Sequence, residues 1–322
     1  MSTREPIYVD HGNEACEGVE AYPPKEVPLG GADALTVRRT LPNMSRSFVG
    51  AWCFVDHYGP EEGKCMDVPP HPHTSLQTVS WLFSGEIEHR DSGDVHAMVR
   101  PGEVNLMTSG YGIAHSEVST KSRDALHGVQ LWTVLPHDKA DIVREFQHHA
   151  PELDDNHSGV KSRVFIGELG DAVSPIHTES PLLGAEIILA PGTTFETPVK
   201  AGFEHGVLVD TGVIDFDGTR LDNSVLGVRD KGLDHLRLHN PTDKPARLML
   251  LGGEPFDEHV VMWWNFIGRS HDDIVRLREE WNEAPGDRFG RVKGYRGAES
   301  WLAAPPLPDG VRLKARHRRG RG

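Results

Sequence analysis

Cysteine is scarce in this chain. Only three occur in 322 residues, at Cys16, Cys53 and Cys65, and no two of them form a CxxC pair. An odd, widely spaced set excludes the disulfide framework of a small secreted protein. The first 24 residues carry Glu and Asp throughout and lack the apolar stretch of a signal peptide. We therefore expect a protein of the reducing cytoplasm.

Positive charge and long apolar runs are also in short supply. Lys and Arg number 34 against 48 Asp and Glu, which gives a formal net charge of −14. This balance favours solubility and argues against general nucleic-acid binding. No apolar run approaches the roughly 20 residues that a membrane-spanning helix needs. The sequence therefore predicts neither a nucleic-acid partner nor a membrane partner.

Glycine and proline are abundant instead, with 34 Gly and 23 Pro between short apolar runs. Short strands punctuated by turn residues are typical of antiparallel sandwiches or small barrels. Two runs of such strands, near residues 48–135 and 185–252, have a similar rhythm and indicate an internal duplication. We expect an all-β protein with domains at residues 1–135 and 161–268 and a poorly periodic linker at 136–160.

One helix is predicted after the second strand-rich run. Ser270 can cap it, and Ile274, Leu277 and Trp281 recur at helical spacing on one face. The end of the chain, from Arg312 to Gly322, holds six Lys or Arg and few apolar residues. We expect residues 269–322 to form a short C-terminal helix and a basic disordered tail.

Two pairs of polar residues frame the first strand-rich run: His71-Pro72-His73 and His115-Ser116-Glu117. Side chains at i and i+2 of a strand point the same way, so each pair offers two ligands on one face. The four residues could also be satisfied separately near turns, but two such pairs favour a metal site. Three imidazoles and a carboxylate suit Fe, Mn, Co, Ni, Cu or Zn, so the residues alone do not name the metal.

Five segments resemble, in order, the pattern of the pirin family of bicupins. They are Arg46-Ser47-Phe48-Val49-Gly50, Asp56-His57-Tyr58-Gly59-Pro60, His71-Pro72-His73, Gly112-Ile113-Ala114-His115-Ser116-Glu117 and Gly128-Val129-Gln130-Leu131-Trp132. The resemblance implies two antiparallel cupin (jelly-roll) β-barrels in tandem. It also implies one mononuclear iron, as Fe(2+), held in the first barrel only. Carried over, the ligands are His71, His73, His115 and Glu117.

The sequence departs from the family pattern at Gln77, where cupins and many pirins have Glu. We expect Gln77 to lie on the same strand face as His71 and His73 and to point into the same cavity. A neutral amide there would not supply the negative charge that raises ligand basicity.

Pirins are associated with two kinds of role. As a dioxygenase of the quercetin 2,3-dioxygenase type, this chain would act on a small aromatic or enol substrate and O₂. Glu117 would then be the catalytic base, and the expected cavity walls are Trp81, Phe83 and Met107. In the alternative role, the metal is a redox sensor and the protein acts by binding another protein without turnover. A third possibility is a different small-molecule substrate.

Overall fold

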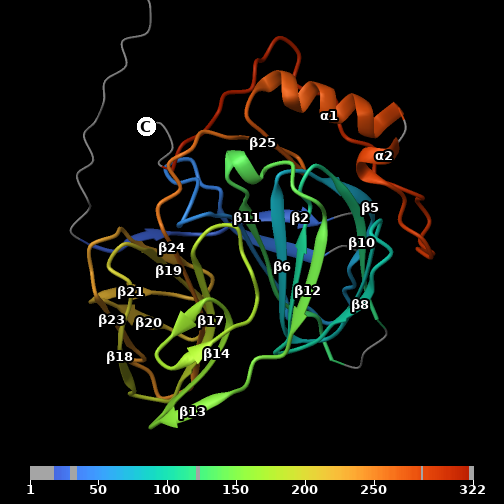
Figure 1. The fold of residues 1–322 in the computed structure, drawn as a ribbon. Helices are drawn as coiled ribbons and strands as arrows, with labels where there is room; N and C mark the ends of the chain where they lie inside the picture. The colour runs from blue at the N-terminus through green and yellow to red at the C-terminus, as the bar shows by residue number, and fades with distance from the viewer. Residues whose placement is uncertain (1–17, 30–34, 121–123, 284–285, 319–322) are drawn as a thin grey trace, which may run out of the picture.

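The protein consists of two cupin domains that lie side by side, with a short helical segment over the first of them (Figure 1). This computed structural model describes residues 18–29, 35–120, 124–283 and 286–318. Cys16 and most of the segment considered for a signal peptide lie outside these ranges. Each domain pairs a seven-stranded sheet with a four-stranded sheet, and the sheets stay open instead of closing into barrels. The all-β, two-cupin prediction is confirmed.

The first domain carries the paired histidines. Its seven-stranded sheet has the order β12-β9-β6-β11-β4-β3-β2, and its four-stranded sheet has the order β5-β10-β7-β8. Their bounds are β2 (Lys25–Leu29), β3 (Leu35–Leu41), β4 (Trp52–Tyr58), β5 (Asp67–His73), β6 (Leu76–Ser84), β7 (Ile87–Asp91), β8 (His96–Val99), β9 (Val104–Thr108), β10 (Ile113–Ser119), β11 (His127–Val134) and β12 (Glu145–His149).

The second domain repeats this design. Its sheets have the orders β1-β22-β19-β24-β17-β14-β13 and β18-β23-β20-β21. Their bounds are β1 (Glu20–Tyr22), β13 (Asp154–His157), β14 (Val160–Ile166), β17 (Leu182–Leu189), β18 (Thr194–Pro198), β19 (Glu204–Thr211), β20 (Ile214–Phe216), β21 (Thr219–Leu221), β22 (Leu226–Arg229), β23 (His235–His239) and β24 (Ala246–Gly253). Two short hairpins lie outside these sheets. One is formed by β15 (Glu168–Leu169) and β16 (Ala172–Val173), and the other, after β24, by β25 (Val261–Trp263) and β26 (Phe266–Gly268).

The two seven-stranded sheets pack face to face and bury one continuous apolar cluster. Val79 and Leu131 of the first domain join Leu208 and Leu251 of the second in this cluster. The backbones come close where Gly50 meets Gly253, since a Cβ at Gly50 would lie 2.5 Å from the Gly253 Cα. Strands β4, β6 and β11 are therefore buried on both faces, one against the second domain and one inside their own cupin.

The connection between the domains differs from the expected linker at 136–160. It begins with a short 3₁₀ turn, η1 (His137–Lys139). Strand β12 then pairs with β9 and extends the first domain's sheet, whereas β13 pairs with β14 of the second domain. The N-terminal strand β1 also belongs to the second domain, through its pairing with β22. These edge strands gain backbone partners that a local hydrophobic pattern does not reveal.

The predicted helix is confirmed as α1 (His271–Glu283), and α2 (Gly286–Phe289) follows it. The Ser270 hydroxyl accepts a hydrogen bond from the Asp273 N–H at 3.1 Å, and the Asp273 carboxylate accepts one from the Ser270 N–H at 2.9 Å. This reciprocal cap satisfies two otherwise unpaired backbone donors. The buried face of α1 packs on the β25–β26 hairpin, next to Phe266. Neither α1 nor α2 has the length and apolar character of a membrane span within the described residues.

Residues 312–318 of the expected disordered tail make defined contacts, and residues 319–322 lie outside the described part of the chain. The Arg316 backbone pairs with that of Val260, and the Arg318 carbonyl accepts a hydrogen bond from the Ser47 N–H at 2.8 Å. The Arg318 guanidinium lies 3.1 Å from the buried carboxylate of Glu204, which also binds Arg46. Charge pairing with a distant acid therefore helps to anchor this tail, together with Leu313 and Ala315, which pack against the apolar cluster around α1.

We predict that ending the chain at Pro308 destabilises the protein. Truncation removes one of the two guanidinium groups paired with the buried Glu204 carboxylate and the packing of Leu313 and Ala315, losses that together should cost about 3 kcal/mol. We expect a fall of about 5 °C or more in melting temperature, measured by calorimetry. Arg312→Ala is the control, because Arg312 pairs with Asp272 at an exposed site where the pair contributes little. An unchanged melting temperature on truncation would contradict the anchoring role.

Candidate metal centre

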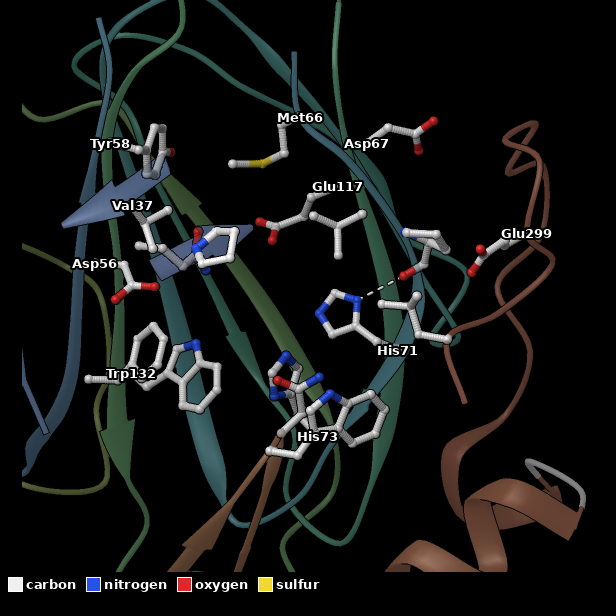
Figure 2. A pocket seen from close by; sticks show the side chains of 18 of the residues that line it. Val37, Asp56, Tyr58, Met66, Asp67, His71, His73, Glu117, Trp132 and Glu299 are labelled. Atoms are coloured by element: carbon white, nitrogen blue, oxygen red, sulfur yellow. Dashed lines mark hydrogen bonds between the residues drawn. The ribbon is translucent and has the colours of Figure 1, made fainter. Parts of the chain in front are cut away.

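A cavity of about 600 Å³ lies between the two sheets of the first domain (Figure 2). One wall is formed by β5 and β10, which carry His71, His73 and Glu117. Strands β3, β4 and β11 form the opposite wall, which includes Asp56 and Trp132. The rest of the lining includes residues of the β25–β26 turn and of the segment after α2, namely Trp264, Asn265, Tyr295, Ala298, Glu299 and Leu302. Segments from the C-terminal part of the chain therefore contribute to the site.

The antiparallel pairing of β5 with β10 brings the two polar pairs together. His115 is registered opposite His71, and His73 lies two residues further along the same face. The His115 ring centroid is 4.3 Å from that of His71 and 4.9 Å from that of His73. The register shifts between His115 and Glu117, where the strand bulges. All four side chains are buried.

Burial keeps the three imidazoles neutral, which is the form that binds metals. It lowers the pKa of His71 to about 4, and it lowers the pKa values of His73 and His115 well below the usual range. The Nδ1–H of His71 donates a hydrogen bond to the Pro69 carbonyl at 2.9 Å, which leaves the lone pair on its Nε2 (Figure 2).

The donor set fits a divalent transition metal. The Nε2 atoms of His73 and His115 are only 2.9 Å apart, and a shared cation stabilises neutral imidazole nitrogens held this close. Glu117 adds a carboxylate whose pKa is raised by burial and whose Oε1 accepts a hydrogen bond from Ser80 at 3.2 Å. The ligand atoms of His71, His73 and His115 lie within 4.8 Å of one another, and those of His115 and Glu117 do so in a second group that includes His89. Imidazole and carboxylate are ligand types that Fe, Mn, Co, Ni, Cu or Zn accept.

Known proteins resemble this chain along most of its length. The family description "Pirin" matches residues 34–133, and "Pirin C-terminal cupin domain" matches residues 184–290. A Pseudomonas aeruginosa protein, provisionally named a quercetin 2,3-dioxygenase, is 40% identical over 87% of this chain and 88% of its own. A pirin-like protein of Caulobacter vibrioides is 35% identical over 80% and 89% of the two chains. The chain belongs to the pirin family.

A solved relative shares the whole architecture of this pirin. The crystal structure of a quercetin 2,3-dioxygenase from Acinetobacter baumannii superposes with a TM-score of 0.84 at 35% sequence identity. The match covers 94% of this chain and 99% of that protein. The overall fold is therefore shared along nearly the full length of both chains.

A second group of buried side chains, between the domains of this pirin, consists of His57, His127 and Asp210. Both histidine Nε2 atoms lie against the same Asp210 oxygen, at 2.7 and 2.6 Å. The other Asp210 oxygen accepts a hydrogen bond from Arg247 at 2.6 Å, and Arg38 lies 3.3 Å from His57. Burial opposes ionisation of Asp210, but these hydrogen bonds and the Arg247 charge hold its pKa far below the usual range. With its carboxylate occupied and two cations adjacent, this group is an interdomain hydrogen-bond cluster and a poor metal site.

Gln77 does not point into the metal cavity, contrary to expectation. Its amide donates a hydrogen bond to Thr108 at 2.9 Å and accepts one from Thr133 at 3.2 Å. Ser75, which separates β5 from β6, has a φ of +57°. This left-handed residue breaks the strand, so the alternation that relates His71 to His73 does not continue to position 77.

Trp81 and Phe83 are not cavity walls either. They lie on the face of β6 that meets the second domain, where Trp81 stacks on Phe165 and donates a hydrogen bond to Glu186 at 3.2 Å. The Phe83 ring packs under the Arg247 guanidinium at 4.1 Å. Met107 pairs with Thr78 across the sheet and is buried, but it is not among the residues that line the cavity.

The aromatic wall of the cavity is formed by Phe54 and Trp132. Their rings stack at 4.0 Å, and Trp132 meets His73 edge-on at 5.0 Å. The Arg39 guanidinium lies 4.2 Å from the Phe54 ring centroid and binds both oxygens of Asp56 at 2.7 Å. Sequence reasoning missed this wall. In β11, Gln130 and Trp132 alternate with Val129 and Leu131, and this two-residue period could have indicated that Gln130 and Trp132 share a face that differs from the core face.

The second cupin holds one unusual histidine. His205 is 1% exposed, and neither ring nitrogen has a hydrogen-bond partner among the described residues. None of the potential metal-binding groups in the described part of the chain lies wholly in this domain. Burial lowers the pKa of His205 to about 4, below the value of about 6.5 expected in the unfolded chain.

His205→Leu is therefore expected to stabilise the protein and to weaken its pH dependence. Removing an unsatisfied buried polar group should raise the free energy of unfolding by about 1–3 kcal/mol at pH 7. Between pH 6.5 and 4, His205 is protonated in the unfolded wild-type chain but stays neutral in the folded protein. The free energy of unfolding of the wild type should therefore fall by about 3 kcal/mol as the pH decreases across this range. Urea unfolding at pH 7 and pH 5 measures both effects. His239→Leu is the control, since His239 is partly exposed and bonded to Thr194; equal pH dependence in all three proteins would contradict the assignment.

Proposed function

We propose that this pirin binds one divalent iron ion through His71, His73, His115 and Glu117. We further propose that it acts as a dioxygenase of the quercetin 2,3-dioxygenase type on flavonols or related enols and phenols. The observation that carries the proposal is the juxtaposition of the convergent histidines with a stacked aromatic wall inside one cavity. The relatives named for this activity in Pseudomonas and Acinetobacter support it.

The size and lining of the cavity suit an aromatic substrate. A volume of about 600 Å³ lies in the range of small-molecule sites. Trp132, which touches both Phe54 and His73, offers a flat face on which an aromatic ring can stack next to the ligand histidines. Apolar groups such as Val37 and Met66 also contribute to the lining.

A divalent transition metal bound here would supply a Lewis acid with redox chemistry suited to O₂. The protein's own contribution is to orient the ring and to remove the substrate's hydroxyl proton. Glu117 is the base in this proposal. The Ser80 hydroxyl donates a hydrogen bond to Glu117 Oε1 at 3.2 Å, and Glu117 Oε2 is the atom that accepts the substrate proton.

The proposed setting of the protein is the cytoplasm. Free thiols at Cys53 and Cys65 are in keeping with a reducing environment.

Oxygen uptake tests this function. Iron-loaded protein should consume O₂ with quercetin, or with members of a panel of other enols and phenols, at a rate proportional to its iron content. The matched control is the variant with both His71 and His73 replaced by Ala, treated with iron in the same way. Stoichiometric iron without turnover on any member of the panel would overturn the dioxygenase proposal and leave the metal-sensor role.

A further inference from the structure

We infer that Asp91 and His89 fix the tautomer of His115 so that its Nε2 lone pair faces the metal site. Both are positioning residues outside the expected ligand set. The inference rests on the proposed metal site, which supplies the reason for the arrangement. It concerns the protein's own protons and can be measured without metal.

The three side chains form a buried row behind the cavity. Strand β7 pairs with β10, so Asp91 is registered opposite His115 and His89 opposite Glu117. All three members of the row are at most 3% exposed. The His89 Nε2 lies 3.3 Å from Asp91 Oδ2, and its Nδ1 lies 3.4 Å from His115 Nδ1. The Phe146 ring covers the outer side of His89 at 4.9 Å.

The hydrogen-bond chain has one favourable arrangement of protons. Asp91 accepts only, so the His89 proton facing it resides on Nε2. The His89 Nδ1 is then an acceptor and can receive the Nδ1–H of His115. That places the His115 lone pair on Nε2, where without metal it accepts the Nε2–H of His73 at 2.9 Å and where a metal ion would take the place of that proton. Any other arrangement sets two acceptors or two protons against each other in a buried space.

The carboxylate of Asp91 is itself held in place. Its Oδ1 accepts hydrogen bonds from the backbone N–H groups of Gly93 at 2.8 Å and Val95 at 3.1 Å. These bonds belong to the tight β7–β8 turn and leave Oδ2 directed at His89. His89 approaches His115 on the Nδ1 side, whereas the ligand nitrogens meet on the Nε2 side. The ligand atoms of His89, His115 and Glu117 also lie within 4.8 Å of one another, and we assign His89 the positioning role in that group because it meets His115 on the Nδ1 side.

Asp91→Asn tests this inference with little change in shape. The amide oxygen can keep the turn bonds, while the amide N–H₂ replaces the acceptor that faces His89. The His89 proton would then move to Nδ1 and that of His115 to Nε2, where it competes with metal. We expect metal binding about 10- to 100-fold weaker, measured with Fe²⁺ against a competing chelator. Asp94→Asn in the same turn is the control, because Asp94 is exposed and paired with Lys293.

Nitrogen-15 NMR of the histidines in metal-free protein separates this role from simple structural damage. In the wild type we expect His115 to be protonated at Nδ1, and in Asp91→Asn at Nε2. An unchanged His115 tautomer in Asp91→Asn overturns the inference, whether or not metal affinity falls. Failure of the dioxygenase proposal would appear as absent O₂ uptake. It would leave the tautomer and the metal affinity unchanged, because both are measured without turnover.

Discussion

Replacing both His71 and His73 with Ala is expected to abolish metal binding and turnover together. The two residues supply half of the expected ligands, and both face His115 across the β5–β10 pair. Metal content, measured by elemental analysis after dialysis, should fall from one ion per chain to roughly a tenth of that or less, because the remaining His115 and Glu117 form an incomplete site.

The second cupin provides the control for this experiment. A variant with His205 and His239 both replaced by Ala should keep the wild-type metal content, since neither belongs to a group that can hold an ion among the described residues. Melting temperatures of both variants establish that the folds survive. Stoichiometric metal in the His71/His73 variant, or its loss in the His205/His239 variant, would show that the site has been misplaced.

Glu117→Gln is expected to lower turnover by roughly 10² or more, the scale typical of losing a general base. The amide keeps the size of the side chain and one oxygen for the metal, so part of the metal should be retained. Ser80 can still donate to that oxygen, as it does to Glu117 Oε1. Steady-state rates are compared at equal metal content, which separates proton transfer from metal loss.

Ser80→Ala is the companion to this measurement. The Ser80 hydroxyl is shared between Glu117 at 3.2 Å and Gln130 at 3.0 Å and does not itself accept the substrate proton, so its removal should reduce turnover much less than Glu117→Gln does. If fully loaded Glu117→Gln turns over an accepted substrate at the wild-type rate, Glu117 is a ligand without a role as base.

The convergence of the three histidines could be anticipated from sequence because it follows from local rules. Two residues apart on β5, His71 and His73 share a face, and one antiparallel pairing brings His115 opposite. The fold class was readable for a similar reason, since short apolar runs with Gly and Pro at their ends are typical of antiparallel sheets.

The cavity walls were harder to anticipate, because β6 is buried on both faces and its sequence shows no alternation. Trp81 and Phe83 face the second domain, and Ser80, next to Trp81, faces Glu117. When each face of a strand meets an apolar surface, hydrophobicity does not indicate which one lines the site. The orientation of Gln77 was unpredictable for another reason, since the left-handed conformation of Ser75 interrupts the alternation between β5 and β6.

Contacts between distant charges were also invisible in the sequence. The basic composition of the C-terminal segment predicts disorder when it is considered alone. Its anchor is the Glu204 carboxylate, 114 residues earlier in the chain. The pairing of β1 with the second domain is likewise a long-range contact without a local signature.

Anomalous diffraction from crystals of the iron-loaded protein tests the central claim most directly. We predict one peak per chain at the iron edge, between the Nε2 atoms of His71, His73 and His115 and the Glu117 carboxylate. A peak between His57, His127 and Asp210, or iron-loaded crystals with no peak in the first cupin, would contradict the account.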